Sequence, residues 1–214
     1  DFATRTSFSL IYLKYKIYVL ILLYLTMPNK IDLRSIYKKK RAVIEDNTLN
    51  AASKIIFDLF IRYIGKKKLS ILLYHSSIAH HEIPTIHWFS KLKKHHTVFV
   101  PKVLDNLLDM EAVKWTKNIE LEKNKFGIFQ PISFCYEDAK SLDVIVVPLL
   151  CFNKTGHRVG YGKGFYDRFL VRCKKKVQKI GISFFEKYEK IDDLTKLDQK
   201  LDIIITPSKL IQFT

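Results

Sequence analysis

Cysteine, glycine, proline and methionine are all scarce in this chain of 214 residues, which has three Cys, seven Gly, six Pro and two Met. Three cysteines without a CxxC spacing exclude a disulfide scaffold and a zinc site built from paired cysteines. The few glycines and prolines exclude a collagen-like or low-complexity chain. We expect the cysteines to be reduced thiols that pack as small apolar groups. With 48% hydrophobic residues, the chain is long enough to bury one sizeable core.

Acidic residues are also few, since 21 Asp and Glu stand against 37 Lys and Arg and the formal net charge is +16. Clustered cations favour polyanionic partners such as nucleic acid. However, 30 of the 37 basic residues are Lys and only seven are Arg, whereas interfaces that read bases favour Arg. Codons rich in A and T encode Lys, Ile, Asn, Phe and Tyr, so base composition can also supply this charge. The charge fits a small polyanionic ligand equally well.

The N-terminal segment 1–26, DFATRTSFSLIYLKYKIYVLILLYLT, differs from the rest of the chain. Residues 8–25 are apolar or aromatic apart from Lys14 and Lys16, which is close to the lower limit of roughly 20 residues for a membrane-spanning helix. A signal peptide requires a cleavage site of small residues, and no such site follows this segment. We expect Met27 to be the initiator, residues 1–26 to be an apolar extension, and residues 27–214 to form one domain of a cytoplasmic protein. An N-terminal anchor or targeting segment is the alternative.

Helix and strand patterns alternate after Met27. Short, wholly apolar strands between amphipathic helices are typical of a mostly parallel sheet that is covered on both faces. The sequence therefore predicts an α/β fold, a single three-layer domain with a mostly parallel sheet and helices on both faces. The predicted helices are Lys30–Val43, Thr48–Ile64 with Thr48 as N-cap and Gly65 as stop, and Pro84–Lys94; the predicted strands are Leu69–Tyr74, Thr97–Val100 ending at Pro101, Val144–Val147, Lys179–Phe184 and Asp202–Thr206.

A glycine-rich loop lies between a buried strand and an amphipathic helix. Four of the seven glycines fall within nine residues, at positions 156, 160, 162 and 164. Such a loop lets backbone N–H groups approach an anion, and the start of the next helix favours negative charge. Lys163 and Arg158 add cations to the loop, and Asp167 offers a carboxylate for Mg²⁺. The spacing matches neither a Walker A loop nor a Rossmann fingerprint. The residues alone leave phosphate binding and a tight structural turn both open.

The segment PLLCFNKTGHRVGYGKGFYDRFL, residues 148–170, resembles the signature of the 5-formyltetrahydrofolate cyclo-ligase family, also called methenyltetrahydrofolate synthetases. Both the glycine spacing and the Tyr166-Asp167 pair match. The resemblance covers most of the chain from Met27. It includes a basic first helix with Lys30 and Arg34, the run 82–85 (EIPT) after a strand, and the element 127–131 (GIFQP).

This resemblance implies an ATP- and Mg²⁺-dependent ligase of folate and one-carbon metabolism. The γ-phosphoryl group of ATP would pass to the formyl oxygen of 5-formyltetrahydrofolate, N10 would attack the activated carbon, and phosphate would leave. The products would be 5,10-methenyltetrahydrofolate, ADP and phosphate. In phosphoryl transfer of this kind, the protein chiefly positions the reactants and stabilises charge. No obligate protein partner is implied.

The resemblance also assigns roles to individual residues. Lys163 and Arg158 would be catalytic, and Asp167 with Asp198 would hold Mg²⁺. The remaining assignments are ATP binding by Lys30, Arg34, Arg158, Gly160, Gly162, Lys163, Gly164 and Tyr166, and folate binding by Leu73, Glu82, Tyr161, Gly162, Lys163, Gly164 and Phe165. Several positions depart from the family pattern: Tyr161 stands where Arg is frequent, Phe165 replaces the first Tyr of a pair, and Asn153 stands where Asp is usual.

A second hypothesis is a non-catalytic relative of the same fold that binds nucleic acid through its lysine-rich surface. The runs that would carry this activity are Lys38–Arg41, Lys66–Lys68 and Lys174–Lys176. Such binding would weaken steeply with salt and would not depend on folate.

Overall fold

The computed structural model describes residues 14–17, 28–106, 108–132 and 135–213. Apart from 14–17, the predicted apolar extension lies outside these residues. Within the described part, no helix combines the length and the apolarity that crossing a bilayer requires. Cys151 and Cys173 are free thiols, and burial raises the pKa of Cys151 to about 12.

Eight strands of the described chain form one sheet in the order β12-β11-β10-β7-β1-β2-β3-β6. The five strands from β11 to β2 run parallel, and β12, β3 and β6 add antiparallel edges. The predicted α/β class with a mostly parallel sheet is therefore confirmed. The strand bounds are β1 Ser70–Leu72, β2 Thr97–Val103, β3 Met110–Lys114, β6 Tyr136–Glu137, β7 Val144–Pro148, β10 Gln178–Ile182, β11 Ile203–Ile205 and β12 Leu210–Gln212, with two hairpins outside the sheet, β4 Leu121–Lys123 with β5 Phe129–Pro131 and β8 Cys151–Phe152 with β9 Arg158–Val159.

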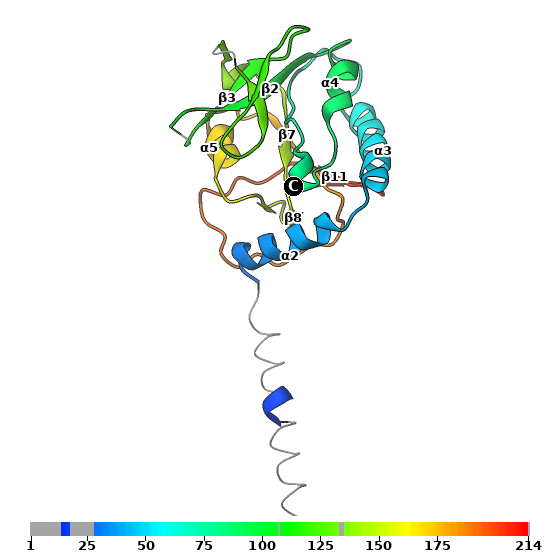
Figure 1. Cartoon of the computed structure of the whole chain (residues 1–214), viewed down its shortest axis with the longest axis vertical. Helices are drawn as coiled ribbons and strands as arrows, with labels where there is room; N and C mark the ends of the chain where they lie inside the picture. Colours follow the sequence, from blue (N-terminus) through cyan, green and yellow to red (C-terminus); the bar gives the residue numbers. More distant parts are fainter. Residues whose placement is uncertain (1–13, 18–27, 107, 133–134, 214) are drawn as a thin grey trace, which may run out of the picture.

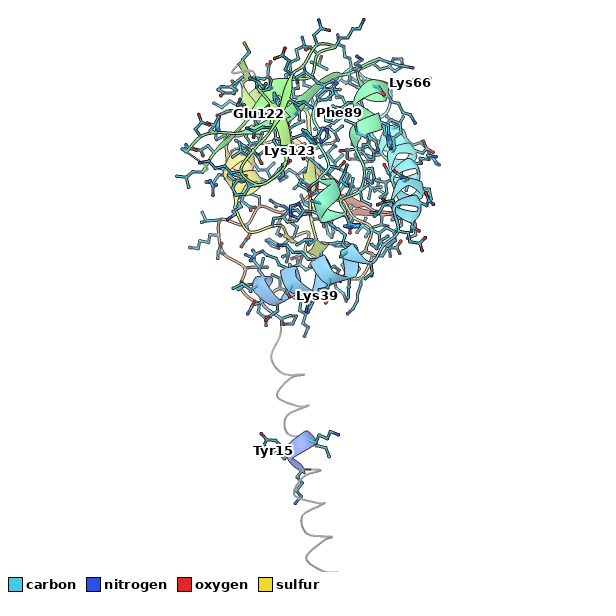
Figure 2. The ribbon with its side chains drawn as sticks, in the orientation of Figure 1. Tyr15, Lys39, Lys66, Phe89, Glu122 and Lys123 are labelled. Carbon is cyan, nitrogen blue, oxygen red and sulfur yellow. The ribbon has the colours of Figure 1, made fainter. Side chains whose placement is uncertain are left out.

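Helices cover both faces of this sheet. Helices α3 (Asp46–Ile64) and α4 (Ile86–Leu92) lie on one side, and α5 (Phe165–Arg172) lies on the other, with η1 (Ile78–His80) and η2 (Ala139–Ser141) as short connections (Figure 1). Strand β7 is buried on both faces, because alternate residues enter different hydrophobic clusters, Val144 and Val146 on the α3 side and Ile145 and Val147 on the α5 side. Phe89 lies inside the fold, while Lys39 and Lys66 extend into solvent (Figure 2).

Helix α2 (Lys30–Ala42) begins at an N-cap that the sequence provides. The Asn29 carboxamide oxygen accepts hydrogen bonds from the N–H groups of Ile31 and Asp32, which satisfies two donors that the helix leaves unpaired. The buried face of α2 consists of Leu33, Tyr37 and Arg41. In Figure 1 this helix crosses the end of the fold nearest β8. The predicted helix at 30–43 is therefore confirmed to within one residue.

Several predicted boundaries differ from the observed ones, most clearly at α3 and β2. Helix α3 begins at Asp46 rather than after Thr48, although Gly65 ends it as predicted, with φ +69°. Strand β2 continues through Pro101 to Val103. A proline is tolerated there because the parallel partner β1 pairs only as far as Phe99, and beyond that point β2 pairs with β3.

Gly156 in the β8–β9 turn packs too closely for a side chain. Its φ is +83°, and an added Cβ would lie 2.7 Å from the carbonyl oxygen of Leu201. We expect Gly156→Ala to lower the free energy of unfolding by about 2 kcal/mol through backbone strain and crowding. Gly127→Ala is the matched control, because Gly127 has φ +72° and an added Cβ would have nothing within 4 Å. Its loss of stability, about 1 kcal/mol, therefore measures only the cost of a left-handed backbone conformation. Equal losses in urea unfolding would contradict the crowding argument.

Candidate active site

A cleft of about 760 Å³ opens at the carboxyl ends of β1 and β7, where ligands bind in open parallel sheets. Tyr74 and His75 follow β1, Pro148 ends β7, and the glycine-rich loop forms one wall. The sequence-predicted site residues on its surface are Lys30, Arg34, Glu82, Arg158, Gly160, Tyr161, Gly162, Lys163, Gly164, Phe165, Tyr166, Asp167 and Asp198. Leu73 does not line the cleft; its fully buried side chain belongs to the hydrophobic cluster on the α3 side.

The glycine-rich loop is fixed to α2 by Arg34. The Arg34 Nε atom donates a hydrogen bond of 3.0 Å to the carbonyl oxygen of Gly160. Gly162 has φ +93°, and an added Cβ would lie 3.0 Å from the guanidinium carbon of Arg34. Gly162 thus allows the guanidinium to approach the loop backbone. The loop and the first helix form one structural unit although more than a hundred residues separate them in sequence.

The predicted cations and the predicted metal ligands are paired with one another. The Lys30 ammonium lies 2.6 Å from Asp198 Oδ2, and Arg158 Nη2 lies 3.0 Å from Asp167 Oδ1. Burial alone would raise the pKa of Asp198, but the Lys30 ammonium and the donors of Thr195 outweigh it, and that pKa is lowered. Both carboxylates are therefore held beside cations that suit a nucleotide phosphate.

The donor set is suitable for Mg²⁺ accompanied by phosphate. Among the described residues, no group of three or more His, Cys, Asp or Glu side chains is arranged to hold a metal ion. Mg²⁺ in proteins typically takes one or two carboxylates and completes its shell with substrate phosphates and water. Asp167 and Asp198 meet that requirement, because both lie on the cleft and the N–H of the neighbouring Gln199 donates to Asp167 Oδ1.

Lys163 differs from Lys30 and Arg158, the two cleft cations that pair with predicted metal ligands. Its ammonium lies 5.4 Å from the centre of the Phe126 ring. Within the described chain, no carboxylate lies close enough to form an ion pair with it. The positive charge of Lys163 is therefore not neutralised by the protein and can face an anionic ligand.

The inner end of the cleft contains a buried polar network. Arg41, only 4% exposed, donates to the Tyr161 hydroxyl at 2.7 Å and to the carbonyl oxygen of Leu149 at 2.6 Å. Tyr161 in turn bonds Glu82, whose Oε2 atom accepts from the N–H of Ser77 at 2.7 Å. Burial raises the pKa of Glu82, although Ser77, Arg41 and Tyr161 oppose that rise. Burial also raises the pKa of Tyr161, so its hydroxyl stays protonated and can donate to Glu82.

Two cleft residues have buried polar atoms without a partner among the described residues, namely His75 Nδ1 and the Tyr166 hydroxyl. Buried polar groups are normally paired, so both atoms indicate hydrogen bonds to a ligand. Burial lowers the pKa of His75, which favours a neutral imidazole. Sequence reasoning placed Tyr166 at the nucleotide but missed His75 and Arg41. Helical spacing could have revealed Arg41, which shares one face of α2 with Lys30, Arg34 and Tyr37.

The first lysine run of the nucleic-acid hypothesis lies apart from the other two in the structure. In the run Lys38–Arg41, Lys38 lines the cleft and Arg41 is buried, so this run does not form a continuous basic surface. The runs 66–68 and 174–176 lie elsewhere in the fold, before β1 and β10.

The fold and the cleft together define the class of this protein. It is an α/β protein in which a cationic, glycine-rich loop suited to an anionic ligand adjoins a pocket lined by aromatic side chains. More specifically, the chain belongs to the 5-formyltetrahydrofolate cyclo-ligase family, whose family model matches residues 26–207.

Individual relatives agree with this assignment. The structure resembles the NMR structure of 5,10-methenyltetrahydrofolate synthetase from Aquifex aeolicus, with a TM-score of 0.72 and 25% identity over 86% of this chain and 92% of that one. A probable 5-formyltetrahydrofolate cyclo-ligase of Caenorhabditis elegans is 27% identical over 86% of this chain and 95% of its own length. The cyclo-ligase of Mycoplasma genitalium is 45% identical over 64 residues, which are 30% of this chain and 38% of that protein.

Proposed function

We propose that this chain is an enzyme that converts 5-formyltetrahydrofolate into 5,10-methenyltetrahydrofolate, with ATP as co-substrate and release of ADP and phosphate. The observation that carries the proposal is the cleft itself. A glycine-rich loop with the unpaired cation of Lys163 adjoins an inner pocket with a buried carboxylate, Glu82. One part suits a polyphosphate and the other suits a polar heterocycle. Membership of the cyclo-ligase family supports the same assignment.

In the proposed reaction, the formyl oxygen attacks the γ-phosphorus of ATP, and the bond to ADP breaks. N10 of the folate then attacks the activated formyl carbon and loses its proton, and the C–O bond breaks with loss of inorganic phosphate. The protein need not supply a covalent nucleophile, since its task is to align two ligands and to stabilise charge on the transferring group. Lys163 and Arg158 are the cations we assign to that charge.

On the nucleotide side, we assign phosphate binding to Lys30 and Arg34 from α2 and to the loop 158–166. Mg²⁺, when bound, would offset phosphate charge, and Asp167 and Asp198 are the residues that would hold it. On the folate side, Glu82 and Tyr161 would hydrogen-bond the ring, and Phe165 lies on the same wall. The Leu73 side chain is not part of this assignment because it is buried in the core.

The test mixes purified protein, as the full chain and as a chain that starts at Met27, with Mg-ATP and 5-formyltetrahydrofolate. We expect the near-ultraviolet absorbance of the methenyl product to rise, and no rise when ATP is omitted. No turnover from folded protein of either length would reject the proposal. Activity in the shorter chain would also support the predicted domain 27–214. We further propose a cytoplasmic location, which the free thiols of Cys151 and Cys173 support, and cell fractionation would test it.

Mg²⁺ dependence should report on Asp167. We expect Asp167→Asn to raise the Mg²⁺ concentration for half-maximal activity at least about tenfold, because one of the two carboxylates is lost. Asp192→Asn is the matched control, since Asp192 is exposed and does not line the cleft. An Mg²⁺ titration of Asp167→Asn that overlays that of Asp192→Asn would remove Asp167 from the metal site.

A further inference from the structure

Basic loops lie next to one another at the amino ends of the parallel strands, the edge of the sheet opposite the cleft. Strands β1, β2, β7 and β10 run parallel, so their amino ends all lie at one edge. A basic run precedes three of them, and the antiparallel strand β3 ends there with a lysine. We define the basic edge as Lys66, Lys67, Lys68, Lys93, Lys94, Lys114, Lys174, Lys175 and Lys176.

Backbone and side-chain contacts hold these loops next to one another. The N–H of Thr97 donates to the carbonyl oxygen of Leu69 at 2.9 Å, which joins the loops before β2 and β1. Asp143, before β7, accepts from the N–H of Ser70 at 2.9 Å and pairs with the Lys174 ammonium at 2.6 Å. Asp143 therefore connects the loop before β1 with the loop before β10, and the basic edge is one continuous surface.

The charge of this edge exceeds what the fold needs. Asp143 pairs with Lys174, and at the adjoining start of β11 Asp202 pairs with Lys179, so the nine lysines set against Asp143 leave a formal charge of +8. Helices α3, α4 and α5 end at this edge, and each helix C-terminus carries about half a negative charge, roughly −1.5 in total. Stabilisation of helix ends therefore accounts for a small part of the lysines. The remaining charge repels itself unless an anion is bound.

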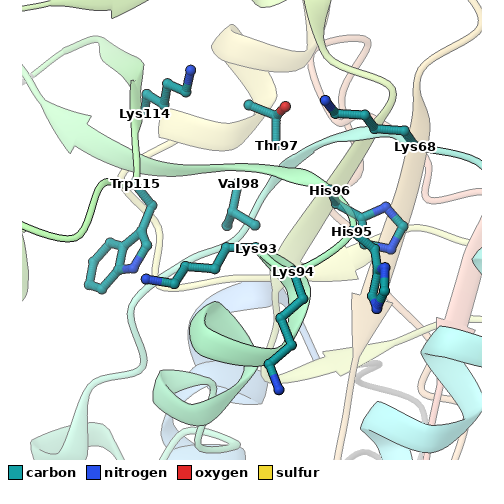
Figure 3. Close-up of a pocket in the computed structure, with 9 residues that line it drawn as sticks. All are labelled: Lys68, Lys93, Lys94, His95, His96, Thr97, Val98, Lys114 and Trp115. Atoms are coloured by element: carbon teal, nitrogen blue, oxygen red, sulfur yellow. The ribbon is translucent and has the colours of Figure 1, made fainter.

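A pocket of about 490 Å³ lies within the basic edge, and its lining includes no acidic residue. In Figure 3, Lys68 and Lys114 stand on either side of the Thr97 side chain. His96 also lines the pocket; it is only 8% exposed, and its Nδ1 atom has no partner among the described residues. A buried, unpaired ring nitrogen among lysines indicates a ligand with hydrogen-bonding oxygen atoms. The complete lining is Lys68, Lys93, Lys94, His95, His96, Thr97, Val98, Lys114 and Trp115.

The proposed cyclisation does not use this surface. The pocket and the active-site cleft share no lining residue. Ligands of the reaction bind at the carboxyl ends of the strands, whereas the basic edge lies at the amino ends.

We propose that the basic edge binds a linear chain of phosphates. The lysines extend across the five neighbouring strands from β10 to β3, a row of about 20 Å at the usual spacing between strands. One phosphate ion could occupy the pocket but could not contact the whole row. Lysines act as point charges and suit a phosphate backbone without base recognition. A single-stranded nucleic acid and inorganic polyphosphate share this chemistry.

The test measures binding of the full chain to a fluorescent 20-nucleotide single-stranded RNA and, separately, to inorganic polyphosphate, at several salt concentrations. The edge variant carries Lys68→Gln, Lys94→Gln and Lys114→Gln. The control variant carries Lys54→Gln, Lys154→Gln and Lys196→Gln, three exposed lysines away from the edge, so both variants lose three charges. A third variant, Lys163→Ala, removes a cation of the cleft.

We expect the edge variant to bind RNA at least about tenfold more weakly at low salt. The negative slope of log K against log salt should become shallower by about 2. The control variant and Lys163→Ala should bind nearly as tightly as the unchanged chain. Binding of polyphosphate but not RNA, with the same ranking of variants, would also support the site and would identify its source of phosphate. The proposal fails if neither chain of phosphates binds, or if both triple variants lose the same affinity.

Discussion

Replacing Lys163 by alanine is expected to lower kcat/KM for cyclisation about a hundred- to a thousandfold, the usual effect of removing one preorganised charge from a transition state. Three other cations of the cleft have carboxylate or carbonyl partners, namely Asp198 for Lys30, Asp167 for Arg158 and Gly160 for Arg34. Lys163 has no carboxylate partner within the described chain, so its charge is available to the transferring phosphate. Steady-state rates at saturating and limiting ATP would measure the effect.

Lys154→Ala is the matched control for this prediction. Lys154 lies in the β8–β9 turn, is exposed and does not line the cleft. We expect its kinetics to match those of the unchanged chain. If Lys163→Ala retained kcat/KM within about threefold of Lys154→Ala, Lys163 would bind no reacting phosphate, and catalysis would have to depend on Arg158 alone.

The second large effect is expected at Arg41. Arg41→Met leaves the Leu149 carbonyl and the Tyr161 hydroxyl without their donor and removes the cation that faces buried Glu82. We expect the free energy of unfolding to fall by about 3 kcal/mol. We also expect KM for 5-formyltetrahydrofolate to rise more than KM for ATP, because Tyr161 and Glu82 line the folate side. Urea unfolding and steady-state kinetics would measure the two effects.

The pH dependence of the unfolding free energy of Arg41→Met separates two contributions to the loss of stability, the electrostatic one and the one from lost packing. Burial already holds the pKa of Glu82 above its ordinary value, and Arg41 opposes that rise. Without Arg41 the folded-state pKa rises further, so the folded state binds this proton more readily than the unfolded chain does. The stability deficit should be largest near neutral pH and shrink as pH falls through the Glu82 pKa. Arg62→Met, at an exposed arginine of α3, is the control. A pH-independent deficit would assign the whole effect to packing.

Much of the fold could be predicted because each central strand is encoded locally. The run 144–147 is β-branched and apolar, and the structure buries all four side chains on two faces of the sheet. Errors arose where a tertiary partner decides the outcome. Pro101 indicates the end of a strand, yet pairing with β3 extends β2 two residues beyond it. Thr48 reads as an N-cap, yet α3 already starts at Asp46.

The site was predictable as a set of residues but not as a network. The family signature selected the glycine-rich loop, and the cleft contains every selected residue except Leu73. That Lys30 pairs with Asp198 could not be read from the sequence, since 168 positions separate them. The position of Arg41 was also missed, because a basic run on a helix normally indicates a solvated face, although helical spacing places this buried residue on the same face as Tyr37.

Helix α2 carries groups for both ends of the cleft on one strip of its surface. In the proposed function, Lys30 and Arg34 belong to the nucleotide side and Arg41 to the folate side, and at 100° per residue their directions differ by at most about 40°. Eleven residues at 1.5 Å each span about 16 Å. One rigid element thus fixes the separation and the relative orientation of the two ligands. A single-residue deletion between Arg34 and Arg41 would turn Arg41 about 100° away from the folate side while every functional side chain remained in the sequence.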